Sequence, residues 1–194
     1  MSLHNATTVE EVQMDEDWSD EITDHLQSVN TRTPTISIHE AVKIGAKPLH
    51  KAAYNGQLEI VKYLLEKGAS IESEDKNGNR PLHRAAYYEQ LEIVKYLLEK
   101  GASIESEDKY GQKPLHLAAM RGQLEIAKYL LGKGASIESE DKYGRKPLHM
   151  AAFGVELKIV KYLLEKGAKI PEINEGWSDE IKDHLRSVNN PLRG

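Results

Sequence analysis

Apolar residues follow one another in two short groups that differ in length. In residues 81–99, a compact group of Leu82, Ala85 and Ala86 precedes a longer one in which apolar positions between Leu91 and Leu98 lie mostly three or four residues apart. This spacing predicts two amphipathic helices joined by a tight turn. Pro81 suits the first position of a helix, and Gly101 suits the left-handed residue that ends one. The polar residues 103–112 that follow predict a loop or β-hairpin.

The same pattern recurs every 33 residues. The triplet Pro-Leu-His begins at residues 48, 81, 114 and 147, and a Gly-Ala pair begins at residues 68, 101, 134 and 167. A nine-residue string, Gly-Ala-Ser-Ile-Glu-Ser-Glu-Asp-Lys, appears unchanged three times, from residues 68, 101 and 134. Two thin helices cannot bury their own apolar faces, so the copies must stack. The expected fold is therefore an all-α repeat solenoid.

The repeated wording resembles the ankyrin repeat over residues 36–174. It reads Asp-x-x-Gly-x-x-Pro-Leu-His-x-Ala-Ala, followed by Gly-x-Leu-Glu-Ile-Val-x-x-Leu-Leu-x-x-Gly-Ala. The resemblance implies a stack of loop-helix-helix units with β-hairpin loops, used to bind other proteins. It names no cofactor, metal or catalytic residue.

Two departures from the family pattern bear on stability and surface. The Thr that usually precedes Pro-Leu-His is replaced by Lys47, Arg80, Lys113 and Lys146. Because these side chains cannot cap a helix as a hydroxyl does, we expect each repeat to lose about 1 kcal/mol or less. The usual Gly between the two helices is kept at residues 56 and 122 but is replaced by Glu89 and Val155.

The pattern divides the chain into three parts. Residues 1–35 are expected to be an acidic segment with an amphipathic helix at 18–29. Residues 36–174 form the array, with a truncated cap at 36–45 and repeats at about 46–76, 77–109, 110–142 and 143–174. Residues 175–194 are expected to hold a capping helix and tail, with one apolar stripe formed by Trp177, Ile181, Leu185 and Val188.

The two ends share a nearly identical segment. Residues 18–30 and 177–189 both follow the pattern Trp-Ser-Asp-Glu-Ile-x-Asp-His-Leu-x-Ser-Val-Asn. The later copy is expected to cap the last repeat. The earlier copy allows two interpretations: it is a second capping helix, or it docks on the last repeat of another molecule and gives head-to-tail self-association.

Charge is unevenly distributed along the chain. The net charge is −5, and residues 1–30 carry eight acidic residues and no Lys or Arg. No strongly basic face of the kind that binds nucleic acid is expected. The acidic segment is either a solubilising tail or a competitor that lies along the basic residues of the loops, namely Lys76, Arg80, Lys109, Lys113, Lys142, Arg145 and Lys146.

Composition limits location and chemistry. The chain has no Cys and no apolar run long enough to span a membrane, so a cytoplasmic location is expected, with the nucleus as the alternative. The four His of Pro-Leu-His would lie about 10 Å apart in a helical stack, too far to share a zinc ion. We expect each ring to bond the backbone of an adjoining loop.

The ankyrin resemblance implies that partners contact the loop tips and the inner ends of the first helices. The corresponding positions vary among otherwise constant repeats: Tyr54, Asn55, Lys76, Asn77, Asn79, Tyr87, Tyr88, Lys109, Tyr110, Gln112, Met120, Arg121, Lys142, Tyr143, Arg145 and Phe153. Tyr, Arg and Met are enriched in interfaces. The second-helix tyrosines, in contrast, recur unchanged and are expected to pack: Tyr63, Tyr96, Tyr129 and Tyr162.

These observations favour a protein-interaction module without catalysis. Two alternatives remain. The near-identity of the repeats would suit an engineered or consensus-like scaffold, although Glu89, Val155 and the irregular ends are poor design choices. The array could also be a regulatory or inhibitory subunit of an enzyme or a transcription factor.

Overall fold

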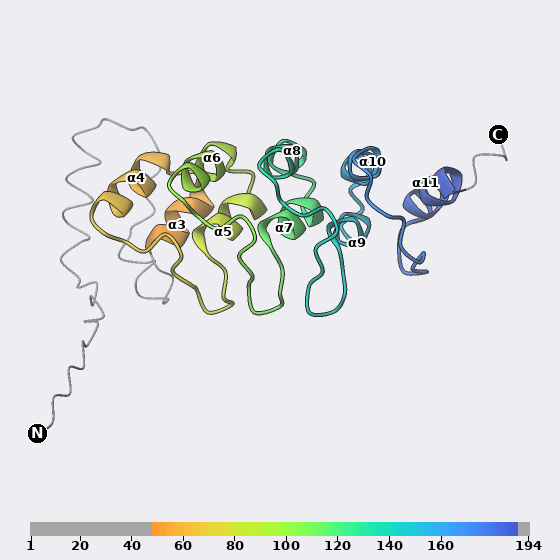
Figure 1. Cartoon of the computed structure of the whole chain (residues 1–194), viewed down its shortest axis with the longest axis horizontal. Helices are drawn as coiled ribbons and strands as arrows, with labels where there is room; N and C mark the ends of the chain where they lie inside the picture. Colours follow the sequence, from red (N-terminus) through yellow and green to blue (C-terminus); the bar gives the residue numbers. More distant parts are fainter. Residues whose placement is uncertain (1–47, 190–194) are drawn as a thin grey trace, which may run out of the picture. The chain divides into compact units, whose positions relative to one another are not determined.

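The computed structural model describes residues 48–189, which form pairs of antiparallel helices followed by one further helix (Figure 1). Expectations for the acidic segment, the helix at 18–29, the truncated cap and the chain end lie outside these residues. The pairs are α3 (Pro48–Asn55) with α4 (Leu58–Glu66), α5 (Pro81–Tyr87) with α6 (Leu91–Glu99), α7 (Pro114–Met120) with α8 (Leu124–Gly132), and α9 (Pro147–Phe153) with α10 (Leu157–Glu165); α11 spans Asp179–Asn189.

The helix pairs stack in two layers. The first helices contact one another in the order α3, α5, α7, α9, and the second helices follow in the order α4, α6, α8, α10. In Figure 1 the loops extend from the first helices on the side away from the second helices. None of the helices in the described range is long and apolar enough to cross a membrane. The predicted all-helical solenoid is confirmed.

Small side chains allow the first helices to approach closely. Ala85 and Ala86 of α5 are fully buried, as are their equivalents in α7 and α9. The second helices supply the larger core residues, such as Ile93, Val94 and Leu97 of α6. Burial of each such aliphatic side chain stabilises the fold by roughly 1.5–3 kcal/mol. Most of this burial is between neighbours, because one helix pair has no interior of its own.

The loops form tight turns instead of the expected β-hairpins. No residue between 48 and 189 is in a strand. In the first loop, the amide of Asp75 donates to the oxygen of Asn79 at 2.9 Å, and the amide of Gly78 donates to the oxygen of Asp75 at 2.9 Å. The side chain of Asp75 takes up two further amides, those of Asn77 and Asn79. The turn is closed within five residues, which leaves no ladder long enough for a strand.

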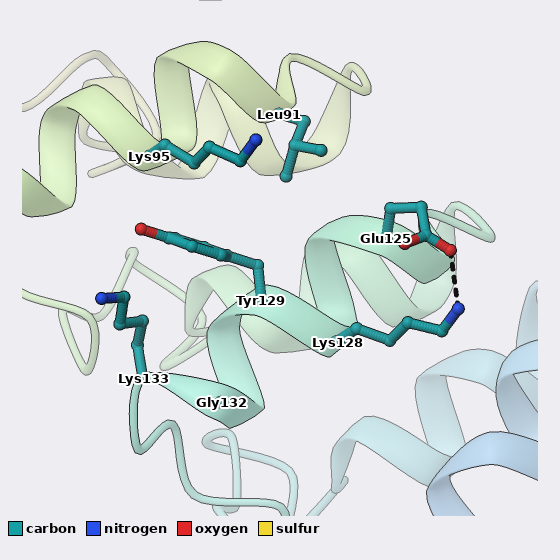
Figure 2. Close-up of a pocket in the computed structure, with 7 residues that line it drawn as sticks. All are labelled: Leu91, Lys95, Glu125, Lys128, Tyr129, Gly132 and Lys133. Carbon is teal, nitrogen blue, oxygen red and sulfur yellow. Dashed lines mark hydrogen bonds and ion pairs between the residues drawn. The ribbon is translucent and has the colours of Figure 1, made fainter.

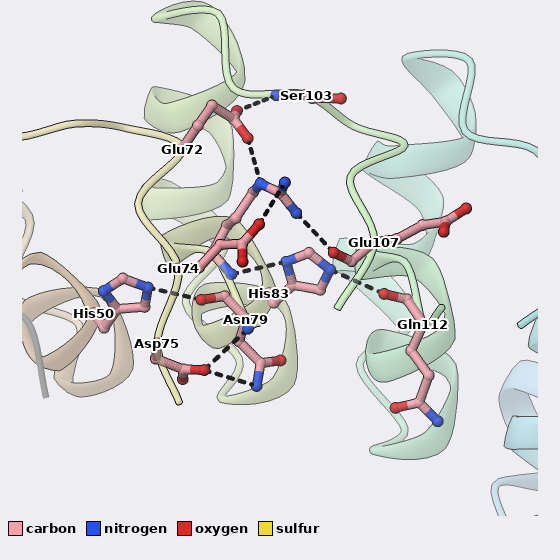
Figure 3. A network of polar contacts seen from close by, with 10 residues as sticks. His50, Glu72, Glu74, Asp75, Asn79, His83, Ser103, Glu107 and Gln112 are labelled. Carbon is pink, nitrogen blue, oxygen red and sulfur yellow. Dashed lines mark hydrogen bonds and ion pairs between the residues drawn. The ribbon is translucent and has the colours of Figure 1, made fainter. Parts of the chain in front are cut away.

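A histidine connects each of the first three repeats to the next. The Nε2 atom of His50 lies 2.7 Å from the oxygen of Asn79, and that of His83 lies 3.0 Å from the oxygen of Gln112 (Figure 3). His116 repeats this contact with the oxygen of Arg145 at 3.0 Å. The expectation that these rings bond the backbone of an adjoining loop is confirmed.

The second ring nitrogen fixes the charge state of these histidines. The Nδ1 atom of His83 accepts the backbone N–H of Arg80 at 3.2 Å. Nδ1 must therefore be unprotonated, and Nε2 carries the hydrogen that is donated to the next loop. His116 is held in the same way by the amide of Lys113. The rings of His83 and His116 are thus neutral bridges that also accept the amide at the start of their own helix.

The basic residues before the last three Pro-Leu-His triplets make no side-chain capping hydrogen bond, but they form ion pairs around the loop. Arg80 lies 2.8 Å from Glu72 and 2.9 Å from Glu74, and it donates to the oxygen of Glu107 in the next loop at 2.7 Å. Glu72 also accepts the amide of Ser103 in the next repeat (Figure 3). Where the family has Thr, this chain therefore has a basic residue that joins neighbouring repeats. These contacts offset part of the stability that is lost with the missing helix cap.

The helix α11 packs against the last helix pair. It contacts α10, and its residues Ile181 and Leu185 are fully buried together with the preceding Trp177. For His149 no equivalent bond to a backbone oxygen is found within residues 48–189, and its ring meets that of Trp177 at a steep angle with the centroids 6.1 Å apart. Val188 differs from the expected stripe because it is 44% exposed.

The buried histidines predict a loss of stability in mild acid. Burial is the largest of the effects that lower the pKa of His83 to about 4, from 6.5 when unfolded. Between these values the unfolded chain binds a proton that the folded chain does not, so stability falls as pH decreases from 6.5 towards 4. For His83 alone, the loss at pH 5 should be on the order of 2 kcal/mol.

Urea denaturation of the full chain at pH 7 and pH 5 measures this loss. A His83→Gln variant keeps polar atoms but does not titrate, so it should lose about 2 kcal/mol less than the native chain over the same interval. Equal losses in both proteins would show that the His83 bridge does not set this pH dependence.

Candidate protein-binding surface

The ends of the first helices present one large side chain per repeat. Tyr54, Tyr87, Met120 and Phe153 occupy equivalent positions, directly after the buried alanine pairs. Phe153 is 72% exposed and Tyr54 37% exposed, whereas Tyr87 and Met120 are half-buried. The row therefore lies where the interior of the stack ends, and it places apolar surface in contact with solvent.

Three of the tyrosines form one cluster across the first two repeats. The ring of Tyr88 lies between those of Tyr54 and Tyr87, with centroids 4.0 Å and 4.7 Å away. Arg121 of the third repeat extends the cluster because its guanidinium lies 4.9 Å from the centroid of Tyr87. Such aromatic and cation–π contacts hold the side chains in place without burying them fully. Burial is the main cause that raises the pKa of the Tyr88 phenol, which keeps it a neutral donor.

The loop tips form a second row that is connected through the backbone. The Nζ atom of Lys109 donates to the oxygen of Lys76 at 2.6 Å, and that of Lys142 donates to the oxygen of Lys109 at 2.8 Å. The amides of the same two lysines donate to the oxygens of Asn77 and Tyr110. Each tip is therefore held by its neighbour, and Tyr110 and Tyr143 point outward as exposed side chains.

Three of the expected contact residues support the loops. Asn79 and Gln112 are each only 8% exposed, and their backbone oxygens accept the histidine bonds. Arg145 is half-buried; its guanidinium pairs with Asp141 at 2.8 Å and lies over Tyr143. These positions were candidates for partner contact because their residues differ between repeats, yet the side chains lie within the turn. Asn55 is half-buried at the end of α3 and has no ring contact.

Part of the expected basic row along the loops is paired with acidic side chains. Besides Arg80, Lys113 lies 2.8 Å from Glu105 and Lys146 lies 2.9 Å from Glu138. These pairs recur because each loop repeats the same acidic residues eight positions before its lysine. Lys109 and Lys142 instead donate to backbone oxygens, so positive charge remains at the loop tips, and competition by the acidic segment stays a prediction.

The turn between α9 and α10 holds a residue that sequence reasoning did not place in the surface. Val155 adopts φ 61°, a left-handed conformation that β-branched residues rarely take, and it is 53% exposed. Glu89 adopts the same conformation in the second repeat, with φ 64°. A signal was present, because both residues stand where other repeats have Gly. With Phe153 two residues earlier, Val155 adds a second exposed apolar side chain to this end of the row.

No group of three His, Asp or Glu side chains in residues 48–189 is arranged to hold a metal ion. The acidic residues nearest the binding rows accept backbone amides or pair with Lys and Arg.

Comparison with known protein families identifies the repeats. A family model described as ankyrin repeats, in three copies, matches residues 21–108 and 103–174. None of the curated proteins searched resembles the chain closely enough to match it.

The strain at Val155 predicts that glycine would stabilise the protein. A non-glycine residue held in a left-handed conformation destabilises the fold by on the order of 1–3 kcal/mol, and glycine would remove this strain. The greater freedom of glycine in the unfolded chain offsets part of the gain. We expect Val155→Gly to raise the free energy of unfolding by about 1 kcal/mol. Urea denaturation measures this gain, provided that the dependence of the free energy of unfolding on urea concentration is unchanged. Glu89→Gly should show a smaller gain. A decrease for Val155→Gly would mean that the exposed side chain packs more than its surroundings indicate.

Proposed function

Since the chain belongs to the ankyrin-repeat family, we propose that it binds a protein partner across the loop tips and the ends of the first helices. Ankyrin repeats generally serve as protein-interaction modules, which supports the general class. The face that we assign consists of the tyrosine cluster with Arg121, the exposed tip tyrosines and the exposed Phe153. We call this the binding face.

The tyrosine cluster is the observation that carries the proposal. Tyr and Arg are the residue types that most often dominate binding energy, and they do so near the centre of an interface. Here Tyr88 joins Tyr54 to Tyr87, and Arg121 joins the third repeat to the second, so the patch spans three repeats without a gap. A partner segment lying across the repeats would meet the cluster along its length.

Rigidity is the second support. The tips are held by backbone bonds between neighbouring loops, and each turn is closed by an aspartate that accepts two amides. A surface that is already ordered loses little conformational freedom when it binds, so more of the contact energy appears as affinity. The exposed side chains of Tyr110 and Tyr143 are presented by this fixed frame.

Affinity capture with the full chain tests the assignment. Protein captured from lysate by the native chain should be lost by a variant carrying Tyr87→Ala, Tyr88→Ala and Tyr110→Ala. Once a partner is identified, its Kd should rise at least tenfold, because truncation of a central aromatic residue commonly costs more than about 1.4 kcal/mol. Circular dichroism and thermal melting of both proteins verify that the variant is folded.

The matched control changes tyrosines of the second helices. A variant with Tyr63→Ala and Tyr96→Ala removes two rings from the opposite layer, in the repeats that also carry Tyr54, Tyr87 and Tyr88. It should keep the partner if the binding face is correctly assigned. Retention by the first variant and loss by the control would overturn the assignment.

A further inference from the structure

The second helices form an outer face with its own grooves. One groove of about 440 Å³ lies between α6 and α8, and one of about 320 Å³ lies between α8 and α10. Figure 2 shows the first, with Tyr129 between the two helices and Lys133 on the same side of α8. These grooves are in the opposite layer from the binding face, which does not use them.

The charge of this face changes along the array. In α4 and α6, each with the lysine that follows it, two acidic residues balance two lysines. In the third repeat Gly132 stands where the other repeats have Glu, so one acidic residue faces two lysines. In the fourth repeat Lys158 stands where the other repeats have Glu, and Glu165 is kept, so one acidic residue is present with three lysines. The outer face is therefore neutral over the first two repeats and basic over the last two.

The lysines of the basic half are mostly not neutralised. Lys128 pairs with Glu125 at 2.7 Å, as the equivalent lysines do in the earlier repeats. For four others, no carboxylate in residues 48–189 lies within ion-pairing distance: Lys133, Lys158, Lys161 and Lys166. Lys133 and Lys166 instead lie over the rings of Tyr129 and Tyr162, at 5.5 Å and 5.6 Å from the centroids.

The groove between α8 and α10 has an apolar lining with lysines at its border. Leu131, Ala135, Ile137 and Tyr162 line it together with Lys128 and Lys166. Gly132 borders both grooves, and a Cβ atom placed there would meet nothing within 4 Å. Since its φ is not left-handed either, the backbone does not require glycine at this position. The effect of Gly132 is to remove a carboxylate and leave the grooves open.

We propose that the outer face of α8 and α10 binds an acidic segment of a partner protein. Carboxylates of the segment meet the ammonium groups of Lys133, Lys158, Lys161 and Lys166, and its apolar side chains enter the groove beside Tyr162. Charge complementarity favours this occupant. A purely apolar segment would leave the lysines without opposite charges, and an uncharged polar segment would gain little from them. The site is separate from the binding face, so the chain has two docking surfaces.

Fluorescence anisotropy with the full chain tests the proposal. The probe is a fluorescein-labelled twelve-residue peptide that repeats Asp-Glu-Leu, and its control peptide repeats Asn-Gln-Leu. The acidic peptide should bind, the amide peptide should bind at least tenfold more weakly, and the affinity for the acidic peptide should fall as salt is raised. Equal binding of the two peptides would overturn the proposal.

Equivalent lysines in different repeats give a matched comparison. Lys133→Gln with Lys166→Gln should weaken binding of the acidic peptide about tenfold, whereas Lys67→Gln with Lys100→Gln removes the same charge from the neutral half and should change it less than twofold. Similar losses for both pairs would show attraction to net charge alone, which contradicts a site on α8 and α10.

A second pair of variants isolates the missing carboxylate. Gly132→Glu restores the residue of the other repeats and should weaken binding about fivefold. Repulsion between two negative charges a few ångströms apart in water changes an affinity by about this factor. Gly132→Gln adds a side chain of the same size without charge and should change binding less than twofold. The Tyr87, Tyr88 and Tyr110 triple variant should bind the peptide as the native chain does, so failure of one proposal can be told from failure of the other.

Discussion

The hydrogen bond from a buried histidine to the carbonyl of the next loop determines how the repeats of this protein meet. One ring nitrogen accepts the amide at the start of its own helix, and the other donates to a backbone oxygen 29 residues further on. The bond therefore fixes two relations at once, the position of a helix within its repeat and the position of the following loop. Because the ring is fully buried and must stay neutral to serve both partners, the loop has one register.

The fixed loops make both rows of the binding face possible. Where a loop is held by His83, its tip lies within reach of the tip before it, and lysine side chains bond the oxygens of their neighbours. The first helices are held just as closely through their alanines, so a tyrosine at one helix end can reach the ring of the next. Order in the interior is thus transmitted to the surface, where residues that differ between repeats are presented at constant spacing.

Sequence reasoning predicts this fold well because its determinants are local and repeated. The helices follow from the spacing of apolar residues. The histidine bond follows because rings one repeat apart are too distant to share a metal ion, which leaves the backbone of the adjoining loop as their partner. The surface is harder to predict. Asn79 and Gln112 vary as exposed residues do, yet the turn buries them. The ion pairs of Arg80 depend on how an acidic loop folds back, which periodicity does not describe.

The fourth repeat departs most from the others, and the architecture explains why it can. It holds the left-handed Val155, and its Phe153 is the most exposed large apolar side chain in the described region. Its second helix, together with the lysine that follows it, carries three lysines. In a repeat array each unit contacts only its neighbours, so a local cost in stability stays close to where it arises. The last pair is also covered by α11, and the buried Trp177 just before this helix meets the ring of His149. Strain and unbalanced charge can therefore accumulate at this end without disturbing the histidine bonds that order the rest.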